Sequence, residues 1–241
     1  MLIKTRAIVL HSIKFGESQY IVDMFAEETG RVAFIQKVLP SGRGKIRKQL
    51  FQPLSLLDIE FDLRPKVRLQ RLKEARLLVP YATIPFDPYK LSLTIFVAEF
   101  LLHVTRNEQQ NKPLFEYVTA SLQWLDGCER SFSNFHLVFM MRLSLFVGFF
   151  PNLDKAGDGV FFDFRAGCFV RQQPLHPDFL PPADAARLRV LMRMTFDNMH
   201  LFAMSRVERN LCVDFILKYY RLHFPDFSEM KSLDVMKSLF A

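Results

Sequence analysis

The chain has 241 residues, half of them apolar, with 32 lysines and arginines against 25 acidic residues. This length predicts one or two domains, and the apolar fraction excludes an intrinsically disordered chain. Three cysteines exclude a disulfide scaffold and indicate a reducing compartment. We find no apolar run of membrane-spanning length and no secretory signal, so we expect a cytoplasmic protein without a membrane partner.

The first 80 residues predict five β-strands. Runs rich in β-branched and aromatic residues alternate with turn-forming segments, and they lie at residues 3–13, 20–26, 32–38, 56–63 and 67–79. In the fifth run the apolar parity changes at Gln70 and Arg71, which is typical of a β-bulge at a barrel corner. Five strands in this length predict a small closed barrel, either an oligonucleotide-binding (OB) fold or an SH3-like barrel.

After residue 80 the apolar period changes from 2 to 3.6, which predicts helices. We expect them at residues 88–106, 113–127, 135–147, 183–196, 206–223 and 227–240. Asp87 and Ser133 are the expected N-caps of the first and third helices, and Ser205 with Glu208 predicts a capping box.

A segment rich in glycine and proline, at about residues 151–182, interrupts the helices and contains a predicted hairpin of residues 160–164 and 169–171. The predicted fold class is therefore α+β. A five-stranded OB-fold barrel at residues 1–80 precedes an α-helical domain with a hairpin insert at residues 81–241.

The positive charge is concentrated in the barrel region. Residues 1–80 hold 15 lysines and arginines against 8 acidic residues, whereas residues 81–241 hold 17 of each. A concentrated basic surface favours a polyanionic partner, with nucleic acid the first candidate. A solvated basic face that serves only solubility is the alternative.

Four cations fall within six residues of the predicted loop 39–50. On a barrel such a loop can follow a phosphate backbone while an aromatic side chain, Phe15 or Phe34, stacks with bases. A solvated mobile loop is the alternative. The DNA-binding residues that we predict are Lys14, Arg31, Lys37, Arg43, Lys45, Arg47, Lys48, Arg68 and Arg71.

No residue pattern indicates catalysis or a metal site. Asp58, Glu60 and Asp62 share one face of a predicted strand, but neighbours on such a face lie about 7 Å apart, which is wide for a shared Mg²⁺ ion. A polar outer face explains them better. Cys128 and Cys168 stand apart from each other and from the third cysteine, so we predict no zinc site, no cofactor and no enzyme activity.

Several segments together resemble the RecO family of bacterial DNA repair proteins. They are residues 7–10 with the turn 15–18, residues 50–60 after the basic loop, residues 113–115, and the run RLSLFVGFFP at residues 142–151. The resemblance follows the whole chain in order. It implies a recombination mediator with an N-terminal OB-fold that binds single- and double-stranded DNA and anneals complementary strands.

The resemblance also implies partners and a site. Members act with RecR, and in some pathways RecF, to load RecA onto DNA coated by single-stranded DNA-binding protein (SSB), so we expect the chain at the nucleoid. Many members hold a four-cysteine zinc site, whereas residues 152–171 here contain only Cys168. Arg142 matches the family's pocket for the SSB C-terminal tail, where it would pair with the terminal carboxylate.

Two other functions remain open from the sequence. The chain could be an RNA-binding OB-fold protein, which competition between single-stranded DNA and RNA would reveal. It could also be a metal-dependent nuclease that uses Asp58, Glu60 and Asp62, which Mg²⁺-dependent cleavage of DNA would reveal.

Overall fold

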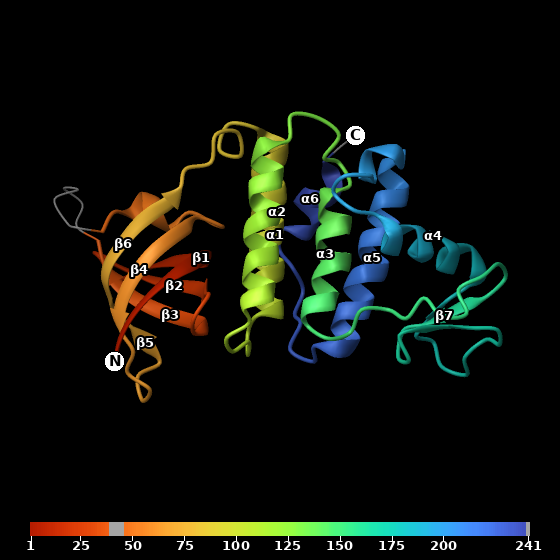
Figure 1. The fold of residues 1–241 in the computed structure, drawn as a ribbon, viewed down its shortest axis with the longest axis horizontal. Coiled ribbons are helices and arrows are strands. Elements are labelled where there is room, and N and C mark those ends of the chain that lie inside the picture. Colours follow the sequence, from red (N-terminus) through yellow and green to blue (C-terminus); the bar gives the residue numbers. More distant parts are fainter. Residues whose placement is uncertain (39–45, 240–241) are drawn as a thin grey trace. The chain divides into compact units, whose positions relative to one another are not determined.

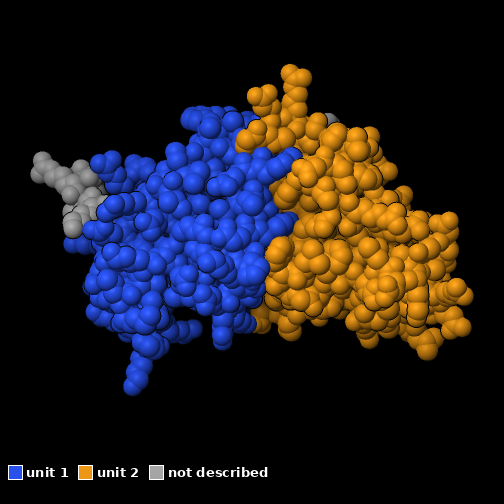
Figure 2. All heavy atoms as spheres, in the orientation of Figure 1, with its two compact units in different colours: residues 1–126, 230–236 blue, residues 127–229, 237–241 orange. Residues whose placement is uncertain are grey.

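The structure, a computed structural model, describes residues 1–38 and 46–239. The chain forms two compact units (Figure 2). One consists of residues 1–126 with 230–236, and the other of residues 127–229 with 237–241. Within the described ranges, no helix has the length and apolar character needed to cross a membrane.

The first unit contains a β-barrel (Figure 1). Its strands run in the order β5-β3-β2-β1-β4-β6, and β5 pairs parallel with β3 while β6 pairs antiparallel with β4. Only Arg71 separates β5 from β6, so this one stretch of chain closes the barrel between β3 and β4. This topology confirms the predicted OB-fold. The strands are β1 Leu2–Phe15, β2 Gln19–Ala26, β3 Gly30–Lys37, β4 Leu56–Asp62, β5 Leu69–Gln70 and β6 Leu72–Val79.

Alternating apolar residues fill the barrel. Val22, Met24, Phe34, Ile59 and Phe61 are almost fully buried in one cluster, and the rings of Phe34 and Phe61 meet edge to face with centroids 5.0 Å apart. The predicted parity change near Gln70 corresponds to the break between β5 and β6. The pairing of β4 with β6 shifts register between Glu60 and Phe61, opposite the start of β6. This irregularity bends β6 round the corner of the barrel.

Two helices complete this unit, α1 (Pro88–Val104) and α2 (Lys112–Gly127). Asp87 caps α1 as predicted, since its carboxylate accepts the N–H groups of Tyr89 and Lys90 at 2.8 and 3.1 Å. Helix α1 packs on β1, and the ring of Phe115 lies 6.0 Å from that of Phe25 on β2. The helices therefore cover one part of the barrel wall.

The second unit is mainly helical. It contains α3 (Phe135–Phe146), α4 (Pro182–Arg193), α5 (Arg206–His223) and a small sheet. The capping box of Ser205 and Glu208 is present as predicted. The predicted hairpin forms β7 (Phe161–Asp163) and β8 (Cys168–Val170), and β9 (Phe179–Leu180), which we did not predict, adds a third strand.

Two helix predictions need correction. The last helix, α6, spans only Leu233–Ser238, because the carboxylate of Glu99 binds the backbone N–H groups of Lys231 and Ser232 and holds a turn there. Asn134, rather than Ser133, lies at the N-cap of α3. The Asn134 amide does not cap the helix, since it donates to the carbonyl oxygens of Met199 and Phe202.

Candidate nucleic-acid interface

The outer face of β1, β2 and β3 presents a row of apolar side chains. Ile13 pairs with Ile21, and Ile21 pairs with Ile35 on β3, so the three lie side by side across the strands. In the next row Phe15 lies opposite Gln19, which lies opposite Lys37. Ile13 and Phe15 are about half exposed, at 46% and 51%. OB-folds bind oligonucleotides on this face and in the loops that border it.

The loop between β4 and β5, residues 63–68, borders this face and is held by one buried side chain. The amide of Gln70 accepts the Arg64 N–H at 3.0 Å and donates to the carbonyl oxygens of Arg64 and Val67 at 2.9 and 2.6 Å. The loop is therefore built into the barrel. It carries Arg64, Lys66 and Arg68, all exposed.

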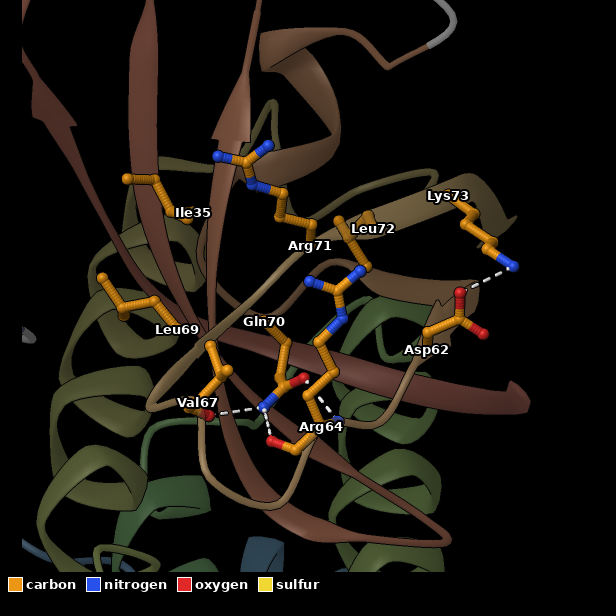
Figure 3. Close-up of a pocket in the computed structure, with 9 residues that line it drawn as sticks. All are labelled: Ile35, Asp62, Arg64, Val67, Leu69, Gln70, Arg71, Leu72 and Lys73. Atoms are coloured by element: carbon orange, nitrogen blue, oxygen red, sulfur yellow. Dashed lines mark hydrogen bonds and ion pairs between the residues drawn. The ribbon is translucent and has the colours of Figure 1, made fainter. Parts of the chain in front are cut away.

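A cavity of about 490 Å³ lies beside this loop (Figure 3). Its lining combines apolar side chains, among them Ile35 and Leu72, with the cations Arg64, Arg71 and Lys73. Both guanidinium groups point away from the Gln70 amide in Figure 3, whereas Lys73 pairs with Asp62 at 2.8 Å. An apolar floor with cations at its rim suits a nucleotide, whose base is flat and whose phosphate is charged.

A second basic group gathers where β3 ends and the short 3-10 helix η1 (Lys48–Phe51) begins. Lys14, Lys37, Arg47 and Lys48 are exposed there. The Lys48 ammonium lies over the Tyr20 ring, 5.7 Å from its centroid. In the part of the chain that the structure describes, no acidic residue pairs with any of these four cations. They are therefore available to phosphate groups.

The nine predicted DNA-binding residues do not form one surface. Lys14, Lys37, Arg47 and Lys48 belong to the η1 end. Arg68 belongs to the β4–β5 loop, and Arg71, between β5 and β6, lines the cavity beside that loop. Arg43 and Lys45 lie outside the described residues.

Arg31 differs from the other predicted cations. It pairs with Asp23 at 2.9 Å, and its guanidinium donates to the Leu102 carbonyl at 3.3 Å and to the Thr105 hydroxyl at 3.4 Å. These contacts tie β3 to the end of α1 and neutralise the charge of Arg31.

The expectation that Phe34 stacks with bases is wrong. The Phe34 side chain is fully buried in the barrel core, because alternate residues of β3, Phe34 among them, point into the barrel. Phe15 has the opposite orientation and is exposed at the end of β1. Phe15 is therefore the aromatic side chain that this face offers to a base.

The acidic face of β4 is paired with basic side chains. Glu60 contacts Lys4 at 2.9 Å, and Asp62 contacts Lys73 at 2.8 Å. The Lys73 hydrogen bond lowers the pKa of Asp62. Among the described residues no group of three His, Cys, Asp or Glu side chains could hold a metal ion.

The hairpin of the second unit is packed by aromatic rings. Phe162, Phe164 and Phe169 are buried, and the ring of Phe162 meets those of the other two at 5.6 and 5.0 Å. Cys168 lies on β8 opposite Asp163 and is a free, partly exposed cysteine. Apolar burial of these rings thus holds the hairpin together.

Arg142 lies on α3, partly exposed. Its Nε donates to the carbonyl oxygen of Met194, the C-cap of α4, at 3.2 Å. Its two terminal nitrogens have no hydrogen-bond partner among the described residues. Arg142 therefore stabilises the end of α4 and still has donors for a carboxylate.

Sequence reasoning missed three residues of this interface, Arg64, Gln70 and Lys73. The three cations at residues 64, 66 and 68 around Pro65 were a visible charge cluster. Gln70 had no such signal, since its importance depends on hydrogen bonds across the loop.

Comparisons with known proteins identify the family. The family model described as "Recombination protein O N terminal" matches residues 1–81, and "Recombination protein O C terminal" matches residues 85–233. DNA repair protein RecO of Phocaeicola vulgatus is 50% identical over 241 residues, which is the full length of both chains. DNA repair protein RecO of Bacteroides fragilis is 48% identical over 241 residues, and that of Azobacteroides pseudotrichonymphae 38% over 240, again covering both chains fully. The chain therefore belongs to the RecO family of DNA repair and recombination proteins.

Proposed function

We propose that this chain is a non-catalytic recombination mediator. It binds single- and double-stranded DNA, anneals complementary strands, and together with RecR helps to load RecA onto DNA coated by SSB. Its work is in the cytoplasm, at the nucleoid. The observation that carries this proposal is the exposed OB face, where Ile13, Ile21 and Ile35 form an apolar row between two groups of unpaired cations.

The contacts of this face suit single-stranded DNA. Lysine and arginine side chains neutralise phosphates without reading the sequence, and the apolar row with Phe15 gives unstacked bases a surface to lie on. Such binding leaves the hydrogen-bonding edges of the bases accessible. A second strand can then pair with them, since the cations reduce the repulsion between the two backbones.

The second unit supplies the partner contact in this proposal. Arg142, with free terminal nitrogens, would bind the carboxylate that ends the SSB tail. Holding SSB by its tail brings the barrel to the strand that SSB covers, and this proximity favours exchange of one protein for the other. RecR is the expected companion on the exposed strand, and RecF a further one in some pathways.

Annealing of two complementary oligonucleotides tests the proposal. The wild-type chain should accelerate pairing of naked strands and also of strands coated by SSB, without Mg²⁺-dependent cleavage. An Lys37→Ala/Arg47→Ala/Lys48→Ala variant should anneal at least tenfold more slowly. Arg130→Ala/Arg221→Ala/Lys231→Ala, which removes three exposed cations elsewhere, serves as the charge-matched control and should behave like wild type.

Three results would reject the proposal: no acceleration by the wild-type chain, cleavage of the DNA, or tighter binding to RNA than to single-stranded DNA of equal length. The partner claim has a separate measurement. RecA filament formation on SSB-coated DNA should speed up only when the chain and RecR are both present, and adding RecF tests its contribution.

A further inference from the structure

A second cleft of the first unit lies between the β4–β5 loop and the turn that joins α1 to α2. It encloses about 770 Å³, which falls within the size range of ligand sites in proteins. Arg64, Pro65 and Arg68 form one wall, Arg106 and Asn107 belong to the other, and the start of β3 forms the floor. The cleft is on the opposite end of β3 from the η1 group.

The free charge in this cleft is positive. Asp23 is neutralised by Arg31 at 2.9 Å. The exposed carboxylate of Glu28 accepts a hydrogen bond from Gln110 at 3.0 Å and keeps its charge, which leaves one negative charge against the guanidinium groups of Arg64 and Arg68. Arg64 and Arg68 are exposed and have no ion-pair partner within residues 1–38 and 46–239. Arg68 lines this cleft, and Arg64 lines both this cleft and the cavity of Figure 3, so the two arginines can contact successive phosphates of one strand.

Both walls of the cleft are fixed in place before any ligand binds. Gln70 holds the β4–β5 loop by its three hydrogen bonds. The opposite turn is bonded to the barrel, since the N–H of Arg31 donates to the Glu108 carbonyl at 2.9 Å. Gly30 also lies so close to Gln109 that a Cβ on it would come within 2.3 Å of the Gln109 carbonyl oxygen. A preformed cleft avoids the ordering cost of binding.

The turn also offers groups that can recognise bases. The side chains of Asn107 and Gln109 are exposed, and neither amide has a partner among the described residues. Side-chain amides both donate and accept, so they match the edges of unpaired bases, which phosphate-binding cations cannot do. Amides beside free guanidinium groups point to single-stranded nucleic acid as the ligand.

The cleft and the η1 group are too far apart to act as one short contact. Arg31 and Lys37 mark the two ends of β3, and six residues of strand span about 20 Å at a rise of ~3.3 Å per residue. The apolar row and Phe15 lie nearer the η1 end. The barrel thus carries two separate groups of free cations.

We propose that the cleft is a second strand-binding site, which holds one single strand of DNA while the η1 group and the apolar row hold another. This inference rests on the proposed annealing function and adds to it that one barrel carries both strands. Two sites on one barrel hold two strands of like charge close together. Each site neutralises the phosphates of its own strand until the bases of the two strands pair.

The test counts short strands on the intact chain. A single-stranded oligonucleotide of about six nucleotides, within the range that an OB-fold covers, should bind twice per chain at low salt. Arg64→Ala/Arg68→Ala and Lys37→Ala/Lys48→Ala should each bind only one, with the remaining affinity within about threefold of wild type. Each variant should anneal at least tenfold more slowly, whereas Arg221→Ala/Lys231→Ala should keep two oligonucleotides and wild-type annealing.

A third variant tests the role of the amides. Asn107→Ala/Gln109→Ala should bind the oligonucleotide in the cleft about tenfold more weakly but an abasic strand of the same length as tightly as wild type. Equal loss for both strands would overturn base recognition by the turn.

The outcomes separate the two proposals. Suppose that the wild-type chain anneals strands but binds only one oligonucleotide, and that both double variants weaken this binding equally. That result would overturn the second site and leave the annealing function intact. A wild-type chain that does not anneal would reject both.

Discussion

The side chain of Gln70 bonds to both backbone polar groups of Arg64, accepting its N–H at 3.0 Å and donating to its carbonyl oxygen at 2.9 Å. Gln70 is 5% exposed, so water cannot replace these bonds without opening the loop. The two basic cavities beside β3 share this loop as a wall. One buried amide therefore sets the shape of the surface to which we assign DNA binding.

Replacing Gln70 by leucine should loosen the loop. The variant loses three hydrogen bonds and leaves the backbone groups of Arg64 and Val67 without this partner. We therefore expect its free energy of unfolding, measured in urea, to fall by about 1–3 kcal/mol. Single-stranded DNA should bind several-fold more weakly. Gln36→Leu, which loses one exposed hydrogen bond, should stay within about 0.5 kcal/mol of wild type. Equal stability of the Gln70 variant and wild type would contradict the clamp.

Gly30 should tolerate no side chain. Its φ of 71° is in the left-handed region, and a Cβ there would lie 2.3 Å from the Gln109 carbonyl oxygen. Gly16 has a similar φ of 68° but open space around it, so Gly16→Ala should cost only about 1–2 kcal/mol. Gly30→Ala should cost more than about 3 kcal/mol, because the α1–α2 turn must also move. Urea unfolding of both variants measures the difference, and equal losses would rule out the close packing.

Stability should fall in mild acid because of His136. Burial lowers the pKa of His136 to about 3, and the charge of Arg209 acts in the same direction. In the unfolded chain the histidine has its ordinary pKa of about 6.5. Below that pH its imidazole is therefore protonated in the unfolded chain but stays neutral in the folded chain. The free energy of unfolding should then fall by about 1.4 kcal/mol per pH unit from this residue as the pH drops from 6.5 toward 3.

Urea unfolding at pH 7, 6 and 5 measures this slope. His136→Leu should show a shallower decline than wild type over the same range, and above pH 6.5 the histidine should contribute no pH dependence. Parallel declines in the two proteins would show that His136 protonates as readily in the folded chain as in the unfolded one.

Arg142→Ala should weaken binding of a peptide with the SSB tail sequence by about tenfold or more, since a hydrogen bond to a charged group is worth about 1.5–3 kcal/mol. Binding of oligonucleotides should hardly change. Arg193→Ala removes an exposed arginine near the same end of α4 and is the control. Fluorescence anisotropy measures both ligands, and a peptide affinity equal to wild type would exclude Arg142 as the carboxylate partner.

Local patterns predicted most of the fold. The period-2 strands, the Asp87 cap and the Ser205 capping box depend on neighbours in the chain, and the structure contains all of them. The short strand β9 and the late start of α6 depend on distant partners. For α6 that partner is Glu99, which lies more than 130 residues from the turn that it binds.

The site was predicted less completely than the fold. The sequence indicates which residues are basic, but their grouping into two surfaces follows from strand register, which no local pattern reveals. For the same reason the sequence did not reveal that Asp23 neutralises Arg31 or that Phe34 points inward. Gln70 was missed because a lone buried amide carries no sequence signature.

The salt dependence of DNA binding tests most directly the central claim, that the basic barrel holds DNA by its phosphates. Each phosphate contact contributes about −0.7 to the slope of log affinity against log salt on single strands. On a strand long enough to contact both groups of cations, Lys37→Ala/Arg47→Ala/Lys48→Ala should therefore show a slope shallower by about two units, uniformly across sequences, while Arg130→Ala/Arg221→Ala/Lys231→Ala keeps the wild-type slope. A folded barrel variant with the affinity and slope of wild type would contradict the account.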